Sequence, residues 1–315
     1  MKKVTLKDIA KELNVTIGTV SHALNGMDDI SPSTKKRVFE TAKKLGYISN
    51  HAAVSLRSGK TNTIAVIVPD ISNPHIAHQI KLIEDAMKQH RYSVIIFNTN
   101  EDDEAERHAI LSACGRQVDG IMLCPAQHST DNVLFLKSLH VPFVLIGRYF
   151  AACDTDYVCA DDVKGGRLAG EYLLAGHYKA PVYVGTYPYI EASINRYTGL
   201  SDVFGQEIEY IETCPNPASG LSLNLSRTNY DYDSVVAFSD LLAFRIAAQL
   251  GRTPKRDIPV IGFDAITRQL HIPFQNVSIG MVGNGWADKA VEILLNKING
   301  STKTCQILID VALFS

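Results

Sequence analysis

The sequence has few of the features that mark membrane, disulfide-bonded or metal-binding proteins. Its 315 residues include one tryptophan and six cysteines, and no two cysteines have the C-x-x-C spacing of a zinc or redox site. Scattered cysteines are typical of free thiols in a reducing compartment. No stretch approaches the roughly 18 uninterrupted apolar residues of a membrane-spanning helix, and the N-terminus lacks the apolar region of a signal peptide. We therefore expect a soluble, cytoplasmic protein.

The short motifs of common enzyme classes are absent as well. The sequence contains no G-x-S-x-G nucleophile motif, no P-loop and no H-E-x-x-H zinc motif. His75 and His78 are three residues apart on an expected helix and could contact one metal ion, but no third ligand accompanies them. This pattern favours exposed helix histidines. We expect no catalytic residue, no cofactor and no metal.

Charge is distributed unevenly along the chain. Residues 1–60 carry eleven Lys and Arg against five Asp and Glu, a net charge of +6, whereas residues 61–315 carry 20 against 28, a net charge of -8. A basic head on an acidic body suits a protein that binds the phosphate backbone of DNA with one end. A solvated charged face is the alternative.

The first 48 residues predict three short helices. Thr5-Leu-Lys-Asp8 can begin the first helix, Thr16 can cap the second, and Ser31-Pro32 can begin the third, which Gly46 ends. The turn between the first two helices is short, so the second helix can protrude and enter a major groove. Helical periodicity alone fits a DNA reader and an ordinary three-helix cap equally well, and the basic charge favours the DNA reader.

From residue 61 onward, apolar strands alternate with helical stretches. This alternation predicts parallel sheets wrapped by helices, arranged as two similar lobes with a crossover near Pro181. Ligands bind such sheets at the carboxyl ends of the strands, so the cleft between the lobes is the expected small-molecule site. The expected strands are 63–68, 92–97, 120–124 and 142–146 in the first lobe, and 181–184, 234–238 and 259–263 in the second.

Motifs along the whole chain resemble the lactose/galactose repressor (LacI/GalR) family of transcriptional regulators. They occur in family order and together are far more specific than any one of them. They are Val15-Thr-Ile-Gly-Thr-Val-Ser-His-Ala-Leu-Asn25, Lys44-Leu-Gly-Tyr47, Asp70-Ile-Ser-Asn-Pro74, Val118-Asp-Gly120, Arg196-Tyr-Thr-Gly199, Phe238-Ser-Asp-Leu-Leu-Ala243 and Pro259-Val-Ile-Gly-Phe-Asp264.

The resemblance implies three regions. Residues 1–48 would form an all-α helix-turn-helix headpiece, residues 49–60 a hinge helix and linker, and residues 61–315 an α/β two-lobed domain like the periplasmic binding proteins. The chain would return to the first lobe near residues 280–300. The sequence lacks a tetramerising C-terminal helix, so we expect a homodimer.

In this family the second helix reads a half-site of an inverted-repeat operator in double-stranded DNA. Three residues match base-contacting positions: Ile17 suits a thymine methyl group, Gly18 offers no side chain, and His22 can donate to guanine N7 or O6. Residues with hydroxyl or amide groups suited to phosphate contacts, with capping or burial as the alternative, are Thr5, Thr16, Thr19, Ser21 and Asn25.

The stretch from Asn50 to Arg57 resembles the family's hinge helix, which is too short to be stable alone and forms when paired across the dimer on DNA. Ala53 and Leu56 would face the partner, Leu56 would wedge into the minor groove, and Arg57 would reach the groove floor. Ser49 and Val54 differ from the usual family residues. A flexible linker is the alternative.

The family binds a sugar, a sugar phosphate or a related metabolite in the cleft. Arg196 matches the family arginine that holds ligand oxygens, with a surface salt bridge as the alternative; Asp264 matches a hydroxyl-binding aspartate, with helix capping as the alternative. Serine replaces the usual asparagine at 239, and glycine replaces an aspartate before Arg148. The candidate effector residues are Asp70, Asn73, Arg148, Arg196, Ser239, Asp240 and Asp264.

These features predict a regulator, a repressor of sugar or metabolite genes, whose operator affinity depends on a cleft ligand. A transcriptional activator of the same family is one alternative. A sugar-binding or transport module is another, although such a protein would carry a signal peptide in place of the basic headpiece.

Overall fold

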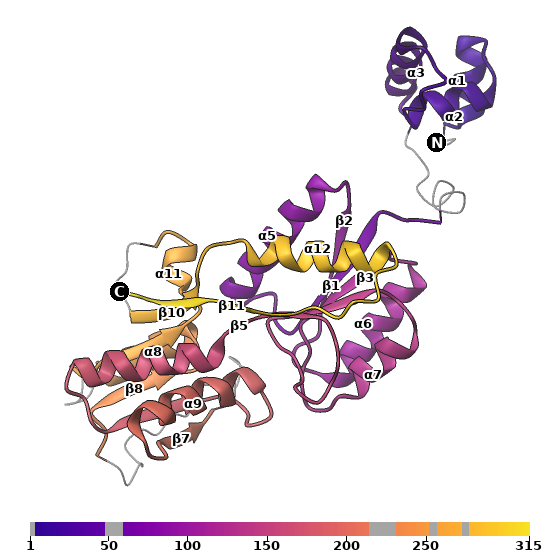
Figure 1. Ribbon diagram of the computed structural model, residues 1–315. Coiled ribbons are helices and arrows are strands. Elements are labelled where there is room, and N and C mark those ends of the chain that lie inside the picture. The colour runs from indigo at the N-terminus through magenta and orange to yellow at the C-terminus, as the bar shows by residue number, and fades with distance from the viewer. Residues whose placement is uncertain (1–3, 48–58, 214–230, 252–256, 273–276) are drawn as a thin grey trace. The chain divides into compact units, whose positions relative to one another are not determined.

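The computed structural model describes residues 4–47, 59–213, 231–251, 257–272 and 277–315 (Figure 1). The chain divides into two compact units, Met1–Thr61 and Asn62–Ser315. Each unit has its own hydrophobic core. In the described part of the chain, no helix combines the length and the apolar character needed to cross a membrane.

The first unit is a bundle of three helices: α1 (Leu6–Leu13), α2 (Ile17–Leu24) and α3 (Pro32–Leu45). Ser31 caps α3 by accepting the Thr34 N–H at 3.3 Å, and Gly46 ends α3 with a left-handed backbone at φ 68°. The small core consists of apolar side chains at helical spacing, which confirms the expected helix-turn-helix: Ile9, Ala10, Val20, Ala23, Val38 and Ala42.

The second unit contains two six-stranded sheets (Figure 1). In the first sheet all neighbouring strands are parallel, in the order β11-β5-β4-β3-β1-β2. Its strands are β1 (Thr63–Val68), β2 (Ser93–Asn98), β3 (Gly120–Leu123), β4 (Phe143–Ile146), β5 (Tyr157–Ala160) and β11 (Gln306–Ile309). The helices that contribute to its core are α5 (Pro74–Gln89) and α12 (Trp286–Ile298) on one face, and α6 (Asp103–Gly115) and α7 (Asp131–Ser138) on the other.

The second sheet has the order β12-β10-β9-β8-β6-β7, with only the β10–β12 pair antiparallel. Its strands are β6 (Pro181–Gly185), β7 (Glu209–Glu212), β8 (Ser234–Ala237), β9 (Val260–Phe263), β10 (Val277–Met281) and β12 (Val311–Phe314). Helices α8 (Asp162–Ala175) and α9 (Glu191–Phe204) pack on one face, and α10 (Asp240–Leu250) packs on the other; α11 (Ile266–Gln269) follows β9. The sheet and helices of each half form one lobe, so the expected two-lobed α/β architecture is confirmed.

The chain crosses between the lobes at three places. It leaves the first lobe between Ala160 and Asp162, earlier than the expected position near Pro181, because α8 already packs on the second sheet through Ala169 and Leu173. It returns after β10 through residues 282–285, and α12 then packs in the core of the first lobe. A third crossing, at Asp310, joins β11 of one sheet to β12 of the other and was not expected from the sequence.

Candidate functional site

The start of the helix-turn-helix is held by side-chain caps. The Asp8 carboxylate accepts hydrogen bonds from the Thr5 backbone N–H at 2.8 Å and from the Thr5 hydroxyl at 2.7 Å. Thr16 accepts the Thr19 N–H at 3.0 Å, and their hydroxyls lie 2.9 Å apart. Two of the expected phosphate-contacting residues, Thr5 and Thr16, therefore occupy N-cap positions, and a third, Thr19, is bonded to Thr16, which fixes where their hydroxyls lie.

The outward face of α2 carries the expected DNA-contacting residues. Ile17 is 48% exposed, and Gly18 and His22 are also exposed, whereas Ser21 is half-buried. Asn25 ends the helix and donates from its side chain to the Ser21 carbonyl at 2.6 Å. Residues at these spacings share one helix face, so the structure brings the expected base-contacting positions together.

His22 has a partner that the sequence did not suggest. Its Nδ1 lies 2.6 Å from a carboxylate oxygen of Asp29, and the two side chains are 48% and 57% exposed. Asp28 and Asp29 are two adjacent acids in a basic region, which was the available signal. The hinge candidates Asn50, Ala53, Leu56 and Arg57 lie outside the described residues.

The two lobes enclose a cavity of about 690 Å³. Six of the seven candidate effector residues line it: Asp70, Asn73 and Arg148 from the first lobe, and Arg196, Ser239 and Asp264 from the second. Each lobe contributes lining residues that follow the carboxyl ends of its strands, as expected for open parallel sheets.

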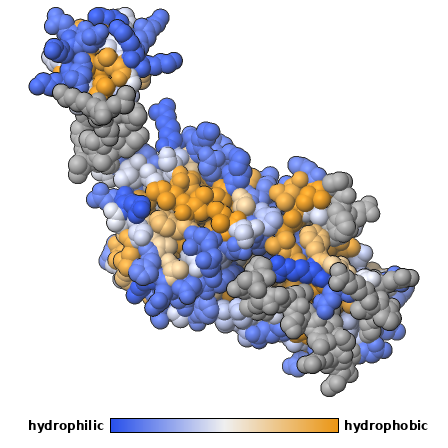
Figure 2. Space-filling view, turned by 180° about the vertical axis from the view of Figure 1, so that it is seen from behind, coloured by the Kyte–Doolittle hydropathy of each residue, from blue (hydrophilic) through white to orange (hydrophobic). Residues whose placement is uncertain are grey.

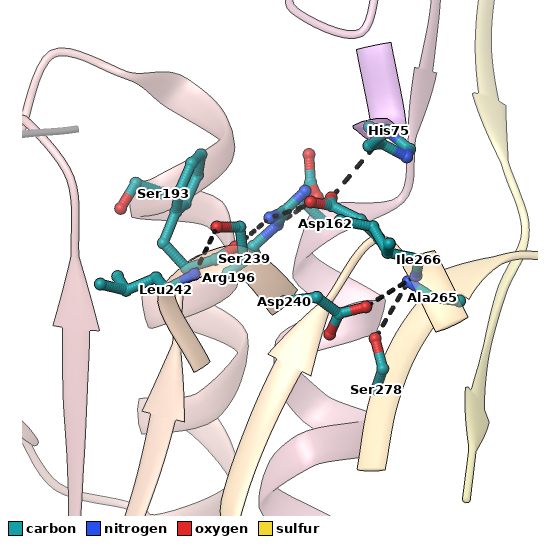
Figure 3. A network of polar contacts seen from close by, with 12 residues as sticks. His75, Asp162, Ser193, Arg196, Ser239, Asp240, Leu242, Ala265, Ile266 and Ser278 are labelled. Carbon is teal, nitrogen blue, oxygen red and sulfur yellow. Dashed lines mark hydrogen bonds and ion pairs between the residues drawn. The ribbon is translucent and has the colours of Figure 1, made fainter. Parts of the chain in front are cut away.

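Arg196 is held in the cavity wall by hydrogen bonds and by ring contacts. Its Nε donates to Asp162 Oδ1 at 2.7 Å (Figure 3). Its Nη1 donates to the Phe238 carbonyl oxygen. The guanidinium also lies over the rings of Phe238 and Phe263, at 4.9 and 4.4 Å from their centroids. Arg196 is 9% exposed, so it is a buried residue that presents part of one face to the cavity, and the surface salt bridge is excluded.

Two glycines allow Arg196 to approach Asp162. A Cβ at Gly199 would lie 2.0 Å from the Val163 carbonyl oxygen, and a Cβ at Gly166 would lie 2.0 Å from the Arg196 carbonyl oxygen. Since real Cβ atoms never come so close, α8 and α9 can only cross at this distance through glycine. The glycine of the R-x-x-G motif therefore positions the arginine of the same motif.

Asp264 has a strained backbone at the end of β9. Its φ is 98°, a conformation that L-residues other than glycine rarely adopt. The backbone is held by two hydrogen bonds, from its own N–H to Ile279 O at 2.7 Å and from the Gln269 side chain to its carbonyl oxygen at 2.6 Å. Its carboxylate lies 4.0 Å from Arg196 Nη1 and 3.9 Å from His75 Nε2. These contacts fix Asp264 at the cavity wall.

Asp240 differs from the other six candidates because it does not line the cavity. The expectation that it contacts the effector is wrong. It is fully buried and does not line the cavity; its carboxylate accepts the Ile266 N–H at 2.7 Å (Figure 3). A Cβ at position 262 would lie 2.1 Å from Asp240 Oδ1, so Gly262 makes room for this carboxylate. Burial, followed by the negative charge of Asp264, raises the pKa of Asp240 to about 7. The side chain points inward because it joins the start of α10 to the segment after β9.

Arg148 reaches the cavity as an ion pair. Its Nη1 and Nη2 each donate to a Glu101 carboxylate oxygen at 2.7 Å, and Nη1 also donates to Pro125 O at 3.0 Å. The side chains are 12% and 25% exposed. A bidentate pair of this kind neutralises the guanidinium before any ligand arrives.

The three remaining candidates shape turns and helix starts beside the cavity. Asp70 Oδ1 accepts the Ser72 N–H at 2.9 Å, Asn73 Oδ1 accepts the His75 N–H at 3.0 Å, and Ser239 Oγ accepts the Leu242 N–H at 3.3 Å. Each side chain therefore has a structural hydrogen bond as well as a place in the cavity wall.

Interlobe contacts border this cavity. His75, at the start of α5, lies 3.2 Å from the side chain of Gln269 in the second lobe. Elsewhere, Tyr189 Oη of the second lobe lies 2.7 Å from His128 Nε2 of the first. The expectation of exposed helix histidines is wrong for His75, whose side chain is only 16% exposed and faces the other lobe. Within the described residues, no three His, Cys, Asp or Glu side chains are grouped to hold a metal ion.

Comparison with protein families assigns both units. The model described as "Bacterial regulatory proteins, lacI family" matches residues 5–50, and the model described as "Periplasmic binding proteins and sugar binding domain of LacI family" matches residues 61–206. The chain belongs to the LacI family.

Relatives of this LacI-family chain are transcriptional regulators. It is 40% identical over 193 residues to catabolite control protein A of Priestia megaterium, a match that covers 61% of this chain and 57% of that protein. It is 28% identical over 320 residues to the HTH-type transcriptional regulator CelR of Thermobifida fusca, with 96% of this chain and 94% of that protein covered. Among solved structures, the lac repressor dimer bound to operator and the anti-inducer ONPF has the same fold, with a TM-score of 0.85, 20% identity, and 100% and 98% of the two chains covered.

The sequence did not indicate several cavity residues of this LacI-family protein. They share no motif and come from loops and helix faces whose orientation depends on packing. Only the position of some of them directly after an expected strand, as with Thr186 after β6, could have signalled them. The missed lining residues include His75, Gln79, Glu101, Thr186, Tyr187, Tyr189, Thr213 and Arg245.

Proposed function

We propose that this chain is a sequence-specific transcriptional regulator that binds an inverted-repeat operator as a homodimer and responds to a small molecule in the interlobe cavity. One observation carries the proposal: a chain with a helix-turn-helix also has a cavity whose wall comes from both lobes. A ligand that touches both lobes can favour one lobe arrangement over another, as control of a distant DNA-binding unit requires.

The DNA-binding part rests on the exposed face of α2. Ile17, Gly18 and His22 lie on that face, and residues 1–60 have a net charge of +6. The apolar surface and the imidazole would meet base edges in the major groove, and the hydroxyl and amide groups around them would bind phosphates. The helix supports only a few base contacts, so we infer that the hinge segment, residues 49–60, contributes through Leu56 in the minor groove.

The cavity favours a neutral, hydroxylated ligand. Its two buried guanidiniums are already bonded to carboxylates, Arg148 to Glu101 and Arg196 to Asp162. An anionic ligand would have to break one of these pairs, whereas hydroxyl groups can bond to their free edges and to Asp264. Two structures of the same fold hold sugars: a CelR–cellobiose complex and a LacI-family transcriptional regulator of Enterococcus faecalis with bound ribose. We infer a neutral sugar effector, to whose hydroxyl groups the exposed Arg245 in the cavity wall would also donate.

An exposed apolar surface supports the dimer. Figure 2 shows hydrophobic side chains gathered on one face of the second unit. Ile71, in the loop between β1 and α5, is 45% exposed, and Ile96, on edge strand β2, is 41% exposed. Large exposed apolar residues of this kind are typical of protein interfaces. A second copy bound through the first lobe would bring two headpieces to one operator, with an isologous contact matching its palindromic symmetry.

We further infer that the regulator represses its target genes. A relative 28% identical over 273 residues is named a ribose operon repressor. Cleft occupancy would change the arrangement of the lobes, and with it the pairing of the two hinge segments on DNA. Gene-expression measurements with the coding sequence deleted distinguish this role from activation, since loss of a repressor raises transcription and loss of an activator lowers it.

Two linked experiments test the proposal. Selection of palindromic duplexes from a random pool by the full chain identifies the operator, and a gel shift with that duplex measures its affinity with and without sugars from a thermal-shift screen. A sugar that binds the cavity should raise the thermal midpoint by mass action and change operator affinity, and the direction of that change classifies it as inducer or corepressor.

The variant Asp264→Asn should weaken the thermal shift caused by the sugar. Asp202→Asn is the control and should leave the shift unchanged, because Asp202 of α9 forms an exposed ion pair with Arg167 of α8. No selected duplex at physiological ionic strength, with or without sugars, would refute the DNA-binding proposal. A sugar that binds equally well to Asp264→Asn would refute the assigned effector site.

A further inference from the structure

The contact between His22 and Asp29 constrains what the recognition helix can read. The Nδ1 atom of His22 lies 2.6 Å from Asp29 Oδ2. An ionised carboxylate can only accept hydrogen bonds, so Nδ1 must carry the proton and donate it. A neutral imidazole has one N–H, and the other nitrogen, Nε2, is then an acceptor.

The surroundings leave Nε2 available. The His22 side chain is 48% exposed on the outward face of α2, and within the described residues Asp29 is the sole group that makes a hydrogen bond or ion pair with it. Nε2 is therefore the nitrogen that can meet a base edge.

The other charged groups of the headpiece are engaged elsewhere or exposed. On the helices that pack against α2, Glu12 lies 3.5 Å from Lys44 Nζ, and Lys35 donates to the Gly26 carbonyl oxygen at 3.0 Å. Asp8 is bonded to Thr5, and Asp28 is an exposed neighbour of Asp29. The remaining charged side chains of α1 and α3 are exposed and form no hydrogen bond or ion pair with His22: Lys7, Lys11, Lys36, Arg37, Glu40 and Lys43.

We propose that Asp29 is a positioning residue that sets the hydrogen-bonding polarity of His22 toward DNA. This inference rests on the proposed function. While Asp29 holds Nδ1–H, a neutral His22 accepts at Nε2, which suits the amino group of adenine or cytosine. Only a protonated His22 donates at Nε2, which suits guanine N7 or O6. The base preference at this operator position therefore follows the protonation of one side chain.

Removing Asp29 should change which base His22 prefers. Without the carboxylate, a neutral imidazole can adopt the other tautomer and donate from Nε2. The variant Asp29→Ala should thus read guanine even at high pH, whereas the wild-type protein should not. Asp28→Ala is the matched control, because it removes the same charge from the adjacent exposed residue without touching His22.

The experiment uses the full chain and a duplex that it selects from a random palindromic pool. All four base pairs are placed symmetrically at each half-site position, and the position at which His22→Ala loses discrimination is the one read by His22. Affinities for the four duplexes are then measured between pH 6 and pH 8.5 at constant ionic strength for the wild type, Asp29→Ala and Asp28→Ala.

In the wild type and Asp28→Ala, the affinity for guanine relative to that for adenine or cytosine should fall about fivefold or more with rising pH. A change of about fivefold is near the lower limit of the discrimination that one base contact provides. In Asp29→Ala this ratio should stay nearly constant. Equal pH profiles for Asp29→Ala and the wild type, or an unchanged base preference in His22→Ala, would overturn the inference while the selected duplex still supports DNA binding. Failure to select any duplex would overturn the proposed function and this inference together. Thermal melts of each variant establish that the exposed substitutions leave the fold intact.

Discussion

Arg196 and Asp162 form a buried ion pair, Nε to Oδ1 at 2.7 Å, which joins the middle of α9 to the first residue of α8. The contact lies at the wall of the cavity and beside the first crossing between the lobes. It depends on Gly166 and Gly199, because any Cβ at either position would overlap the backbone of the other helix. The geometry of this part of the cavity wall is therefore set by the packing of α8 against α9 behind it.

Substituting Gly199 by alanine should separate α8 from α9 and displace Arg196. We expect the free energy of unfolding to fall by about 2–3 kcal/mol, since overpacking outweighs the better helix propensity of alanine. Urea unfolding measures the change. Gly115→Ala is the control: Gly115 ends α6, and a Cβ there would meet no atom within 4 Å, so its stability should stay equal or rise slightly. Equal stability of the two variants would show that the helices can move apart at little cost.

Replacing only Arg148 in the Arg148–Glu101 pair should lower the free energy of unfolding more than replacing both residues. Arg148→Met leaves Glu101 without its bidentate partner and should lower the free energy of unfolding by about 2 kcal/mol, because Glu101 is still one quarter exposed. The double variant Arg148→Met, Glu101→Gln should recover part of that loss. A double-mutant cycle by urea unfolding, without sugar, measures the coupling. Strictly additive effects would mean that the pair contributes no interaction of its own.

Asp240 should make stability depend on pH between about 4 and 7. Its pKa in the folded protein is raised to about 7, mainly by burial, and unfolding returns it to about 4. A raised carboxyl pKa gives stability that is present below pH 4 and is lost as the pH rises to about 7. Asp240→Asn removes this titration, so between pH 5 and pH 8 the wild type should lose on the order of 2 kcal/mol relative to the variant. Thermal melts across this range test it, and parallel pH profiles would contradict it.

Leu56→Ala should weaken operator binding while leaving the second unit unchanged. If Leu56 wedges between base pairs in the minor groove, its truncation should lower operator affinity about tenfold and reduce DNA bending. Gel shifts with circularly permuted duplexes measure both quantities. Leu134→Ala, which truncates a 51% exposed leucine on α7, is the control. Unaltered affinity and bending in Leu56→Ala would remove the hinge from the proposed mechanism.

Local sequence patterns predicted much of the fold because they act over short distances. Caps such as Thr16 and Ser31, and the helix end at Gly46, fix where the headpiece helices begin and end. Apolar runs located seven of the twelve strands of the described chain. The other five, β5, β7, β10, β11 and β12, were not among the expected strands, since each has only four or five residues and most of them pair with segments distant in sequence.

The candidate site was predicted less evenly. The motif residues Arg196 and Asp264 do line the cavity, but Asp240, adjacent to Ser239 in sequence, is turned into the core. Neighbouring residues at the start of a helix point in different directions, and only packing against β9 decides which one faces the cavity. His75 and Glu101 were missed because their partners, Gln269 and Arg148, lie far away along the chain.

The sequence by itself determined the family, the helix-turn-helix, and the alternation of strands and helices, because motifs, caps and periodicity are local properties. The tertiary structure alone decided where the chain crosses between the lobes, which polar side chains line the cavity, and which form internal ion pairs. It also showed that His22 is held by Asp29. These outcomes depend on contacts between segments that only folding brings together.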